Sequence, residues 1–459
     1  MSETQADHHR LSEEASTRPS TKELKRVLGF WDLMGASAGQ IIGAGIMTLT
    51  GVAIAMTGRS VPISFLLAAL LVVVLSVPFV LINGSVRLRG GMYTIITELV
   101  HPSLGGFFTL IFIMTNISIS LYAMSFAQYL QALVPVNVTV VGVAVLVVFY
   151  VLNLVGVNAM AKVENFVVSV LVIALATFSV FGIGKIVPDY FAEASWMPNG
   201  WMGLLQAAAL LTFATGGATV VANLAGEAKN PVKDIPKVII FSTLGVAVLY
   251  AFMSVIAAGV LPIDDVAGQP LTLVAQEILP APLYYFFVVG GAMFALVSTL
   301  NAQLAWATKP VLQACVDGWF PRWLGYIHPK TGTPVVLLTL LFLVGLVPIL
   351  VGLNLGEIGT MVIFISQAVN ILYAVAILNL QKKMPEQWNA SSYHISRPWL
   401  WVVVLLSAFV TVLQAYLMAA GMSPTMVWFN VGFAVVGLAY SLWWYRSGRT
   451  DMEVSYESD

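Results

Sequence analysis

Charged residues are scarce in this sequence. Asp, Glu, Lys and Arg make up 9% of the 459 residues, against about 25% in an average soluble domain. Cysteine occurs once, at Cys315, so an internal disulfide and a cysteine metal cluster are both excluded. No phosphate-binding loop, His-Glu-x-x-His pair or activated cysteine is visible either. The sequence therefore predicts no enzymatic activity, no metal ion and no cofactor.

Long apolar runs dominate what is present. Hydrophobic residues make up 59% of the chain, and the mean hydropathy is +0.89. A helix needs roughly 20 apolar residues to cross the bilayer core, and we place about twelve such runs. They lie near residues 30–57, 61–86, 103–134, 138–154, 163–187, 200–225, 236–261, 283–308, 334–353, 355–380, 398–420 and 423–445. The sequence predicts an all-α membrane protein.

Basic residues are distributed unevenly between the predicted spans. With the N-terminus in the cytoplasm, all but two of the 21 Lys and Arg residues fall in inner segments, the exceptions being Arg59 and Lys185. This places a multi-pass protein in the cytoplasmic membrane with both termini cytoplasmic. We expect a disordered tail over residues 1–28, without a signal peptide, and a second tail over 447–459. Basic loops that face the lipid bilayer give no sign of a nucleic-acid partner.

A glycine cluster interrupts the first predicted span. Within Gly39–Met47, Gly43 and Gly45 lie one residue apart, and such a pair favours a loop over a helix. The alternative is close helix packing, because Gly35 and Gly43 belong to a row of glycines spaced four residues apart. Gly45 lies off that row and favours the break. Broken helices within a membrane are tolerated where their free backbone groups line a cavity or meet a ligand.

A second cluster, Gly216 and Gly217, interrupts the sixth predicted span within Leu211–Thr219. The two interrupted spans occupy matching positions if the chain contains two five-helix repeats that are inverted relative to each other, and such a pair marks the central site of a transporter. We expect a transporter domain over residues 29–446. Its parts are a first repeat over 29–187, a second repeat over 200–380 and two extra helices over 398–446.

The ends of broken helices offer unpaired backbone groups to a ligand. Free N–H groups suit a carboxylate, and free carbonyls suit an ammonium group. An amino acid carries both groups on one carbon. Charged side chains are almost absent from the middles of the predicted spans, and the nearest carboxylates are Glu98 and Glu227. Recognition is therefore expected to rest on the backbone and on neutral polar groups.

Four motifs in order along the chain carry a family resemblance. They are Ile42–Ile46, Arg89–Tyr93, Phe213–Gly217 with Gly226–Pro231, and Asp317–Pro321 with His328–Pro334. The chain resembles the amino acid, polyamine and organocation transporter superfamily, whose amino acid permeases have a five-plus-five inverted-repeat (LeuT-like) fold. The third motif is the most specific, because the family's sixth span ends in such a Glu-x-Lys-Asn-Pro turn. The resemblance implies that spans 1 and 6 unwind at mid-membrane.

The resemblance also implies the positions of a substrate site. The substrate carboxylate would meet backbone N–H groups around Ala44 and Gly45, and the ammonium group would meet carbonyls. Phe213 matches an aromatic position that covers the bound substrate as a thin gate. The implied backbone site consists of Ile41, Gly43, Ala44, Gly45, Phe213, Gly216 and Gly217.

Spacing from the motifs suggests a side-chain pocket. Its implied members are Ser120, Thr215, Thr219 and Gln303, with Gln40, Asn116 and Asn301 as further polar residues nearby. For each of them the alternative is an interhelical hydrogen bond worth about 0.6 kcal/mol. Gln303 is the first residue to test, because its amide needs hydrogen-bond partners in hydrocarbon.

The chain departs from its relatives at three positions that bear on charge. Leu171 stands where several relatives have a lysine in the fifth span. Thr219 stands where some cationic amino acid exchangers have a glutamate. Asn83–Ser85 replaces an acidic residue at the inner end of the second span. Ser298 and Thr299 leave an ion site of oxygen ligands open, and the neutral pocket favours a neutral substrate.

The sequence thus predicts a secondary active transporter or exchanger of small neutral or polar amino acids that works by alternating access. One alternative is a transporter of amines or organic cations, which needs an acidic pocket residue. Another is an amino acid sensor that does not transport. The sequence makes no prediction of the oligomeric state.

Overall fold

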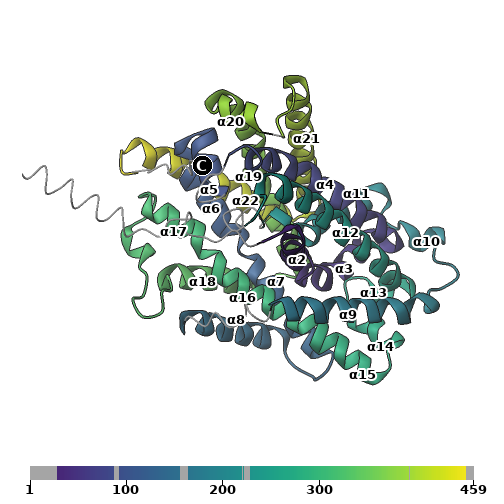
Figure 1. Cartoon of the computed structure of the whole chain (residues 1–459). Coiled ribbons are helices and arrows are strands. Elements are labelled where there is room, and N and C mark those ends of the chain that lie inside the picture. The colour runs from purple at the N-terminus through teal and green to yellow at the C-terminus, as the bar shows by residue number, and fades with distance from the viewer. Residues whose placement is uncertain are drawn as a thin grey trace, which may run out of the picture.

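The computed structural model describes residues 28–86, 92–155, 164–219, 221, 228–391 and 393–450. This part of the chain is built from helices, with one isolated β-bridge between Leu28 and Ala228 (Figure 1). Several predicted features lie outside it. They are almost all of the N-terminal tail, residues 451–459 of the C-terminal tail, Arg89–Gly91 of the second motif, and Gly226 and Glu227 of the third.

Eight helical stretches in the described part are long and apolar enough to cross a membrane. They are Gly45–Asn83, Pro102–Gln131, Val138–Val155, Lys233–Gly259, Ala281–Val316, Leu355–Lys383, Arg397–Gly421 and Pro424–Arg446. Three shorter apolar helices accompany them, at Ser169–Lys185, Gly200–Thr215 and Val335–Val351. The chain is therefore a multi-pass membrane protein.

The count of eight differs from the expected number of about twelve for two structural reasons. The first long stretch contains two helices, α3 (Ala44–Thr57) and α4 (Val61–Asn83), which meet at Gly58 with φ of +68°. Glycine adopts this left-handed conformation without steric strain. In addition, three of the expected runs are occupied by the shorter helices.

The first helix group surrounds the N-terminal helices. In Figure 1 α2 (Phe30–Ile41) and α3 lie near the middle of the view. Helix α12 (Pro231–Gly259) packs on α4 and α2, and α11 (Gly200–Thr215) packs on α4 and α3. The first group therefore joins segments that lie far apart in the sequence.

The second helix group lies beside the first. Its members pack on one another as α7 on α8, α16 on α7, α18 on α8, and α9 on the π-helix η8. The bounds are α7 (Ser118–Gln131), α8 (Val138–Val155), α9 (Glu164–Gly182), η8 (Phe286–Met293), α16 (Phe294–Trp306) and α18 (Val335–Val351).

The remaining long helices cover one side of the two groups. Helix α19 (Leu355–Lys383) packs on α21 (Arg397–Gly421) and on α6 (Gly105–Thr115), and α22 (Pro424–Arg446) also packs on α6. The shorter elements between these helices are α5 (Met92–Ile95), the π-helix η3 (Ile96–Val100), α10 (Glu193–Trp196), α13 (Ile263–Val266), α14 (Thr272–Ile278), α15 (Ala281–Tyr285), α17 (Thr308–Val316), α20 (Pro385–Ala390), and 3₁₀ turns η2 (Gly58–Ser60), η4 (Pro102–Leu104), η6 (Ile183–Lys185) and η9 (Arg322–Gly325).

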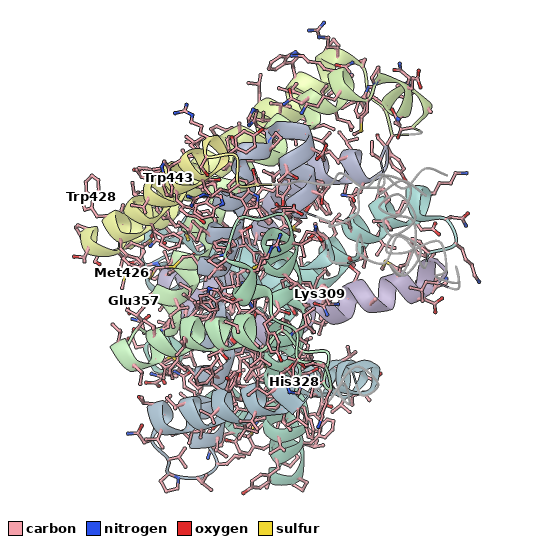
Figure 2. All side chains as sticks on the ribbon, turned by 90° about the vertical axis from the view of Figure 1, so that its left-hand side faces the viewer. Lys309, His328, Glu357, Met426, Trp428 and Trp443 are labelled. Atoms are coloured by element: carbon pink, nitrogen blue, oxygen red, sulfur yellow. The ribbon has the colours of Figure 1, made fainter. Side chains whose placement is uncertain are left out.

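Helix α22 carries exposed aromatic residues on its outer face. Trp428 is 72% and Trp443 is 61% exposed, and both project from the helix in Figure 2. Along a helix with a rise of 1.5 Å per residue they are about 22 Å apart. Tryptophan collects at both membrane–water interfaces, so this spacing fits a helix that crosses the bilayer.

Two of the four motifs meet at one end of the bundle. Tyr93 of the second motif donates a hydrogen bond from its hydroxyl to Asp317 Oδ2 of the fourth, at 2.7 Å. Gln313 Nε2 donates to the other carboxylate oxygen at 2.9 Å. Trp319 is fully buried, and a Cβ placed at Gly106 would lie 2.5 Å from its ring. The motif residues that the structure describes here therefore have a packing role.

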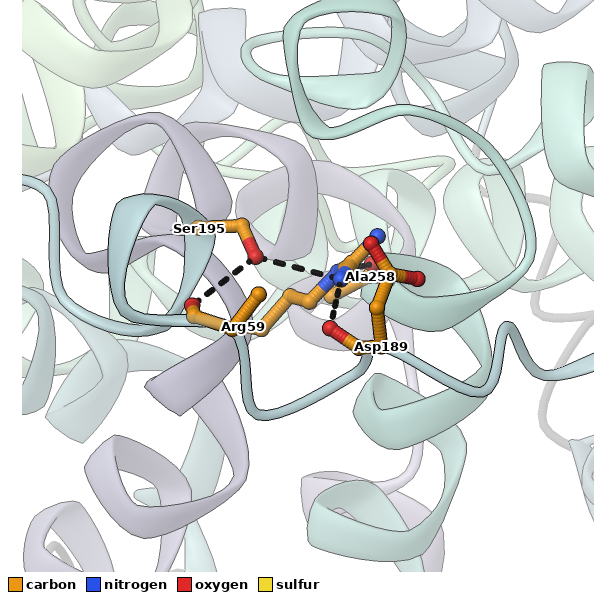
Figure 3. Close-up of polar contacts among 5 residues, drawn as sticks. Arg59, Asp189, Ser195 and Ala258 are labelled. Carbon is orange, nitrogen blue, oxygen red and sulfur yellow. Dashed lines mark hydrogen bonds and ion pairs between the residues drawn. The ribbon is translucent and has the colours of Figure 1, made fainter.

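Arg59 lies in the η2 turn between α3 and α4, where it connects three segments of the chain (Figure 3). Its side chain is 5% exposed, and its guanidinium donates to the carbonyls of Asp189 at 2.7 Å and Ala258 at 3.3 Å. It also donates to Ser195 Oγ at 3.1 Å. Tyr190 donates from its hydroxyl to the Arg59 carbonyl at 2.7 Å, and burial raises the pKa of this tyrosine, which the nearby Arg59 cation partly offsets.

We expect Arg59→Met to destabilise the protein by about 1.5–3 kcal/mol, because it removes a buried charged donor from three acceptors, of which the Ala258 carbonyl is buried. Lys185→Met is the matched control, since Lys185 is the other basic residue that the sequence assigns to this side, and its side chain is exposed. Thermal unfolding in detergent, followed by size-exclusion chromatography, measures both variants. Equal midpoints for Arg59→Met and the wild type would contradict the role of Arg59.

Candidate functional site

The chain is not helical at the first glycine cluster. Helix α2 ends at Ile41 and α3 begins at Ala44. Between them Ile42 has φ, ψ of −75°, 83° and Gly43 has −147°, −139°. The Gly43 N–H donates to the Ile41 carbonyl at 2.9 Å, so the first free N–H groups of α3 begin at Ala44.

The chain leaves the helix again at the second cluster. Helix α11 ends at Thr215, where Gly216 is extended with φ, ψ of −77°, 179°. Its N–H donates to the Thr212 carbonyl at 2.9 Å. Gly217 has φ of +108°, a conformation that other residues rarely adopt. The last carbonyls of α11, including that of Phe213, therefore lack the donors that a continuing helix would supply.

The two breaks lie against each other. A Cβ placed at Gly45 would lie 2.6 Å from the Ala214 Cα, too close for any other residue without movement of the backbone. A Cβ placed at Gly217 would lie 3.3 Å from the Gln40 carbonyl oxygen. The N-terminal end of α3 and the C-terminal end of α11 thus meet, with free N–H groups from one and free carbonyls from the other.

Two further elements approach the first break. Tyr250 of α12 donates from its hydroxyl to the Ile41 carbonyl at 2.8 Å. The Gly43 N–H donates to the same oxygen, so both of its lone pairs are occupied. On another side a Cβ placed at Gly43 would lie 2.9 Å from Thr299 Oγ1 of α16. The break is therefore enclosed by helices of both groups.

Phe213 lies next to the second group as well. Its ring is 6.2 Å from that of Tyr122 of α7, measured between centroids, with an interplanar angle of 31°. Phe213 is half-buried, whereas Tyr122 is buried. The pair joins α11 to α7 by an aromatic contact beside the break.

Two small side chains of the predicted pocket bond to their own helices. Ser120 Oγ donates to the Ile117 carbonyl at 2.5 Å, and Thr215 Oγ1 donates to the Leu211 carbonyl at 3.1 Å. Both residues are fully buried. Their oxygens keep acceptor lone pairs, but their protons are used locally.

Gln303 connects helices of the second group. Its Nε2 donates to Asn116 Oδ1 at 3.0 Å and to Ser118 Oγ at 2.8 Å. These partners lie where α6 and α7 join. Asn301, two residues earlier on α16, accepts a hydrogen bond from Asn153 Nδ2 of α8 at 2.8 Å. The amides of α16 thus make the interhelical bonds that were the alternative to direct substrate contact.

A cavity of about 190 Å³ lies beside the second break. Gly216, Gly217 and Thr219 contribute to its wall, so Thr219 is the side-chain candidate that this cavity brings next to the break. Its other polar lining residues come from α4, α11, α19 and α21, and the sequence analysis did not select them. They are Ser76, Thr212, Ser366, Gln367, Asn370, Tyr373 and Gln414. Gln367 and Gln414 each stand within a long apolar run, and that signal could have identified them.

A second cavity, of about 520 Å³, lies between α3, α11, α19 and the turn that joins α21 to α22. Glu357 and Met426, both labelled in Figure 2, contribute to its wall. Glu357 caps α19 together with Asn354, since each accepts a hydrogen bond from the other's backbone N–H at 2.9 Å. The carboxylate is therefore part of a helix cap.

The interhelical role of Gln303 can be measured by a double-mutant cycle with Ser118. We expect Gln303→Leu and Ser118→Ala to be coupled by about 0.6 kcal/mol in unfolding free energy, the average for such bonds in membranes. A cycle of Gln303→Leu with Ser366→Ala, on α19, is the control and should show no coupling. Additive effects in the first cycle would contradict a Gln303–Ser118 bond.

Comparison with known proteins identifies the family. The family described as "Amino acid permease" matches residues 28–441. The branched-chain amino acid permease BcaP of Bacillus subtilis is 31% identical over 398 residues, which is 80% of this chain and 83% of the relative.

Two more distant relatives are named for other substrates. The methylthioribose transporter of Bacillus subtilis is 26% identical over 464 residues, covering 94% of this chain and 96% of the relative. The chloroplastic cationic amino acid transporter 6 of Arabidopsis thaliana is 28% identical over 386 residues, covering 75% and 65%. With the family match and the helical multi-pass structure, this chain belongs to the amino acid permease family of the APC superfamily and is a transporter, not an enzyme.

Proposed function

We propose that this chain is a secondary active transporter or exchanger of small neutral or polar amino acids. It acts in the cytoplasmic membrane by alternating access, and both termini are cytoplasmic. The substrate carboxylate binds the N–H groups of Ala44 and Gly45. The substrate ammonium group binds the carbonyls of Phe213 and Gly216, while Phe213 covers the site. The Ile41 carbonyl, which the resemblance also implied, already accepts hydrogen bonds from Gly43 and Tyr250.

One observation carries the proposal: the two helix breaks lie in contact. The 2.6 Å approach at Gly45 and Ala214 brings the N-terminal end of α3 to the C-terminal end of α11. Opposite partial charges of the two helix ends then face a shared site. An α-amino acid presents the complementary pair of charges on a single carbon, so its backbone fits without a charged protein side chain.

The neutral character of the cavity beside the break supports a neutral substrate. No described residue of its wall is Asp, Glu, Lys, Arg or His. An isolated charge in such surroundings would be strongly disfavoured. The similarity to a branched-chain amino acid permease also favours a neutral substrate. The similarity to the more distant cationic amino acid transporters would instead favour a substrate with a positively charged side chain.

The packing of the two helix groups supports a rocking movement. We propose twelve spans, with an inverted repeat over 29–187, another over 200–380, and two extra helices. The first helix group, which contains both breaks, would rock against the second as a substrate neutralises the exposed helix ends. Because substrate has to bind both states, its affinity for them must be similar.

The test of function is counterflow in proteoliposomes. Vesicles loaded with unlabelled alanine, leucine or serine should accelerate uptake of the same labelled amino acid, whereas arginine, methylthioribose and simple amines should not. Acceleration by arginine or methylthioribose alone would contradict the proposed substrate class. Binding without any flux, under counterflow or an imposed ion gradient, would make the protein a sensor.

Gly45→Val should reduce uptake by about ten-fold or more, because overpacking against Ala214 costs roughly 1–3 kcal/mol and displaces the binding N–H groups. Gly217→Ala should act in the same direction, since its φ of +108° strains any other residue. Gly35→Val is the matched control, because a Cβ there meets nothing within 4 Å. Chromatography in detergent verifies insertion, and normal uptake by inserted Gly45→Val would contradict the site.

A further inference from the structure

The cavity beside the second break has room for part of a ligand. Its volume of about 190 Å³ is more than ten times the roughly 10–15 Å³ that a single water needs. Gly216 and Gly217 form part of the wall, so the cavity opens onto the backbone groups of the break. Residues of α4, α19 and α21 form the far wall.

Gln414 of α21 is distinctive among these residues. Its side chain is 1% exposed, and neither Nε2 nor Oε1 has a hydrogen-bond partner in the described part of the chain. The hydroxyl of Tyr373, on α19, is also buried without a partner there. Leaving such a buried group without a partner is unfavourable. The two side chains therefore hold unused hydrogen-bonding capacity in the wall of the cavity.

Four other polar side chains of the wall already make hydrogen bonds within their own helices. Ser76, Thr212 and Ser366 use their hydroxyl protons in this way, and Asn370 uses one of its two N–H groups. The bonds run from Ser76 Oγ to the Val72 carbonyl at 2.7 Å, from Thr212 Oγ1 to the Ala209 carbonyl at 2.6 Å, from Ser366 Oγ to the Ile363 carbonyl at 2.8 Å, and from Asn370 Nδ2 to Gln367 Oε1 at 3.0 Å. Gln414 and Tyr373 are the wall residues whose buried polar atoms have no partner in the described part of the chain.

The chemistry of these two groups defines their complement. Gln414 offers two N–H donors and a carbonyl acceptor, and Tyr373 offers a hydroxyl that both donates and accepts. Because the described wall has no charged residue, a charged group would lack a counter-ion. The matching group is neutral and carries both a donor and an acceptor, as a carboxamide or a hydroxyl does.

We propose that the side chain of the substrate enters this cavity and that Gln414 binds a carboxamide or hydroxyl group on it. The protein then prefers glutamine or asparagine to apolar amino acids of similar length. This inference rests on the proposed function, since it takes the substrate carboxylate and ammonium groups to be held at the two breaks.

The test compares glutamine with methionine, which have similar length, in competition against labelled uptake in proteoliposomes. The wild type should prefer glutamine. Gln414→Leu should lower the glutamine-to-methionine preference by about ten-fold, the effect of one lost hydrogen bond, while methionine uptake persists. Tyr373→Phe removes a single oxygen and should lower the preference to a smaller extent, which keeps the test decisive if Gln414→Leu fails to fold.

Asn430→Leu is the matched control. Asn430 is a fully buried amide on α22 whose Oδ1 also lacks a partner in the described part of the chain, but it does not line this cavity. Its replacement should leave the preference unchanged. A wild type that takes up methionine without preferring glutamine, or an unchanged preference in both cavity variants, would overturn the inference alone. A wild type that transports no amino acid would overturn the proposed function.

Discussion

Every backbone N–H and carbonyl in hydrocarbon needs a partner, and the architecture of this protein depends on how that requirement is met at two places. A continuous helix satisfies it internally, but the chain stops being helical at Ile42–Gly43 and again after Thr215. The unpaired groups of the two breaks are brought together by the close approach of Gly45 to Ala214. A residue larger than glycine at position 45 would separate them.

The surrounding helices hold the breaks in this position. Tyr250 binds the Ile41 carbonyl from the first helix group, and Thr299 approaches Gly43 from the second. Gln303 then fastens α16 to the α6–α7 junction through Asn116 and Ser118. The amide that the resemblance places near a substrate therefore stabilises the helices behind the site. This supporting role is consistent with a site whose contacts come mainly from the backbone.

The charged side chains of Arg59 and Asp317 make their contacts at the ends of the helix bundle, away from the two breaks. The buried guanidinium of Arg59 binds two carbonyls and Ser195 at one end. Asp317, with Tyr93 and Gln313, joins two motifs at another end. Around the breaks the described cavity wall contains only neutral groups. The arrangement confines strong electrostatic interactions to the ends of helices and leaves the proposed substrate as the main charged group in the centre.

Local properties of the sequence were sufficient to predict the helices, the membrane environment, the family, and interruptions near Gly43 and at Gly216–Gly217, although Gly45 itself lies within α3. Each of these depends on residues close together in the chain: apolar runs of span length, glycine pairs and short motifs. The partners of the buried polar side chains could not be predicted in this way. The spans are apolar on nearly all sides, so their sequences do not indicate which face meets which neighbour. Only the tertiary structure decided that Gln303 would meet Ser118 and that Gln414 would line a cavity without a partner in the described chain, because those outcomes depend on how distant helices pack.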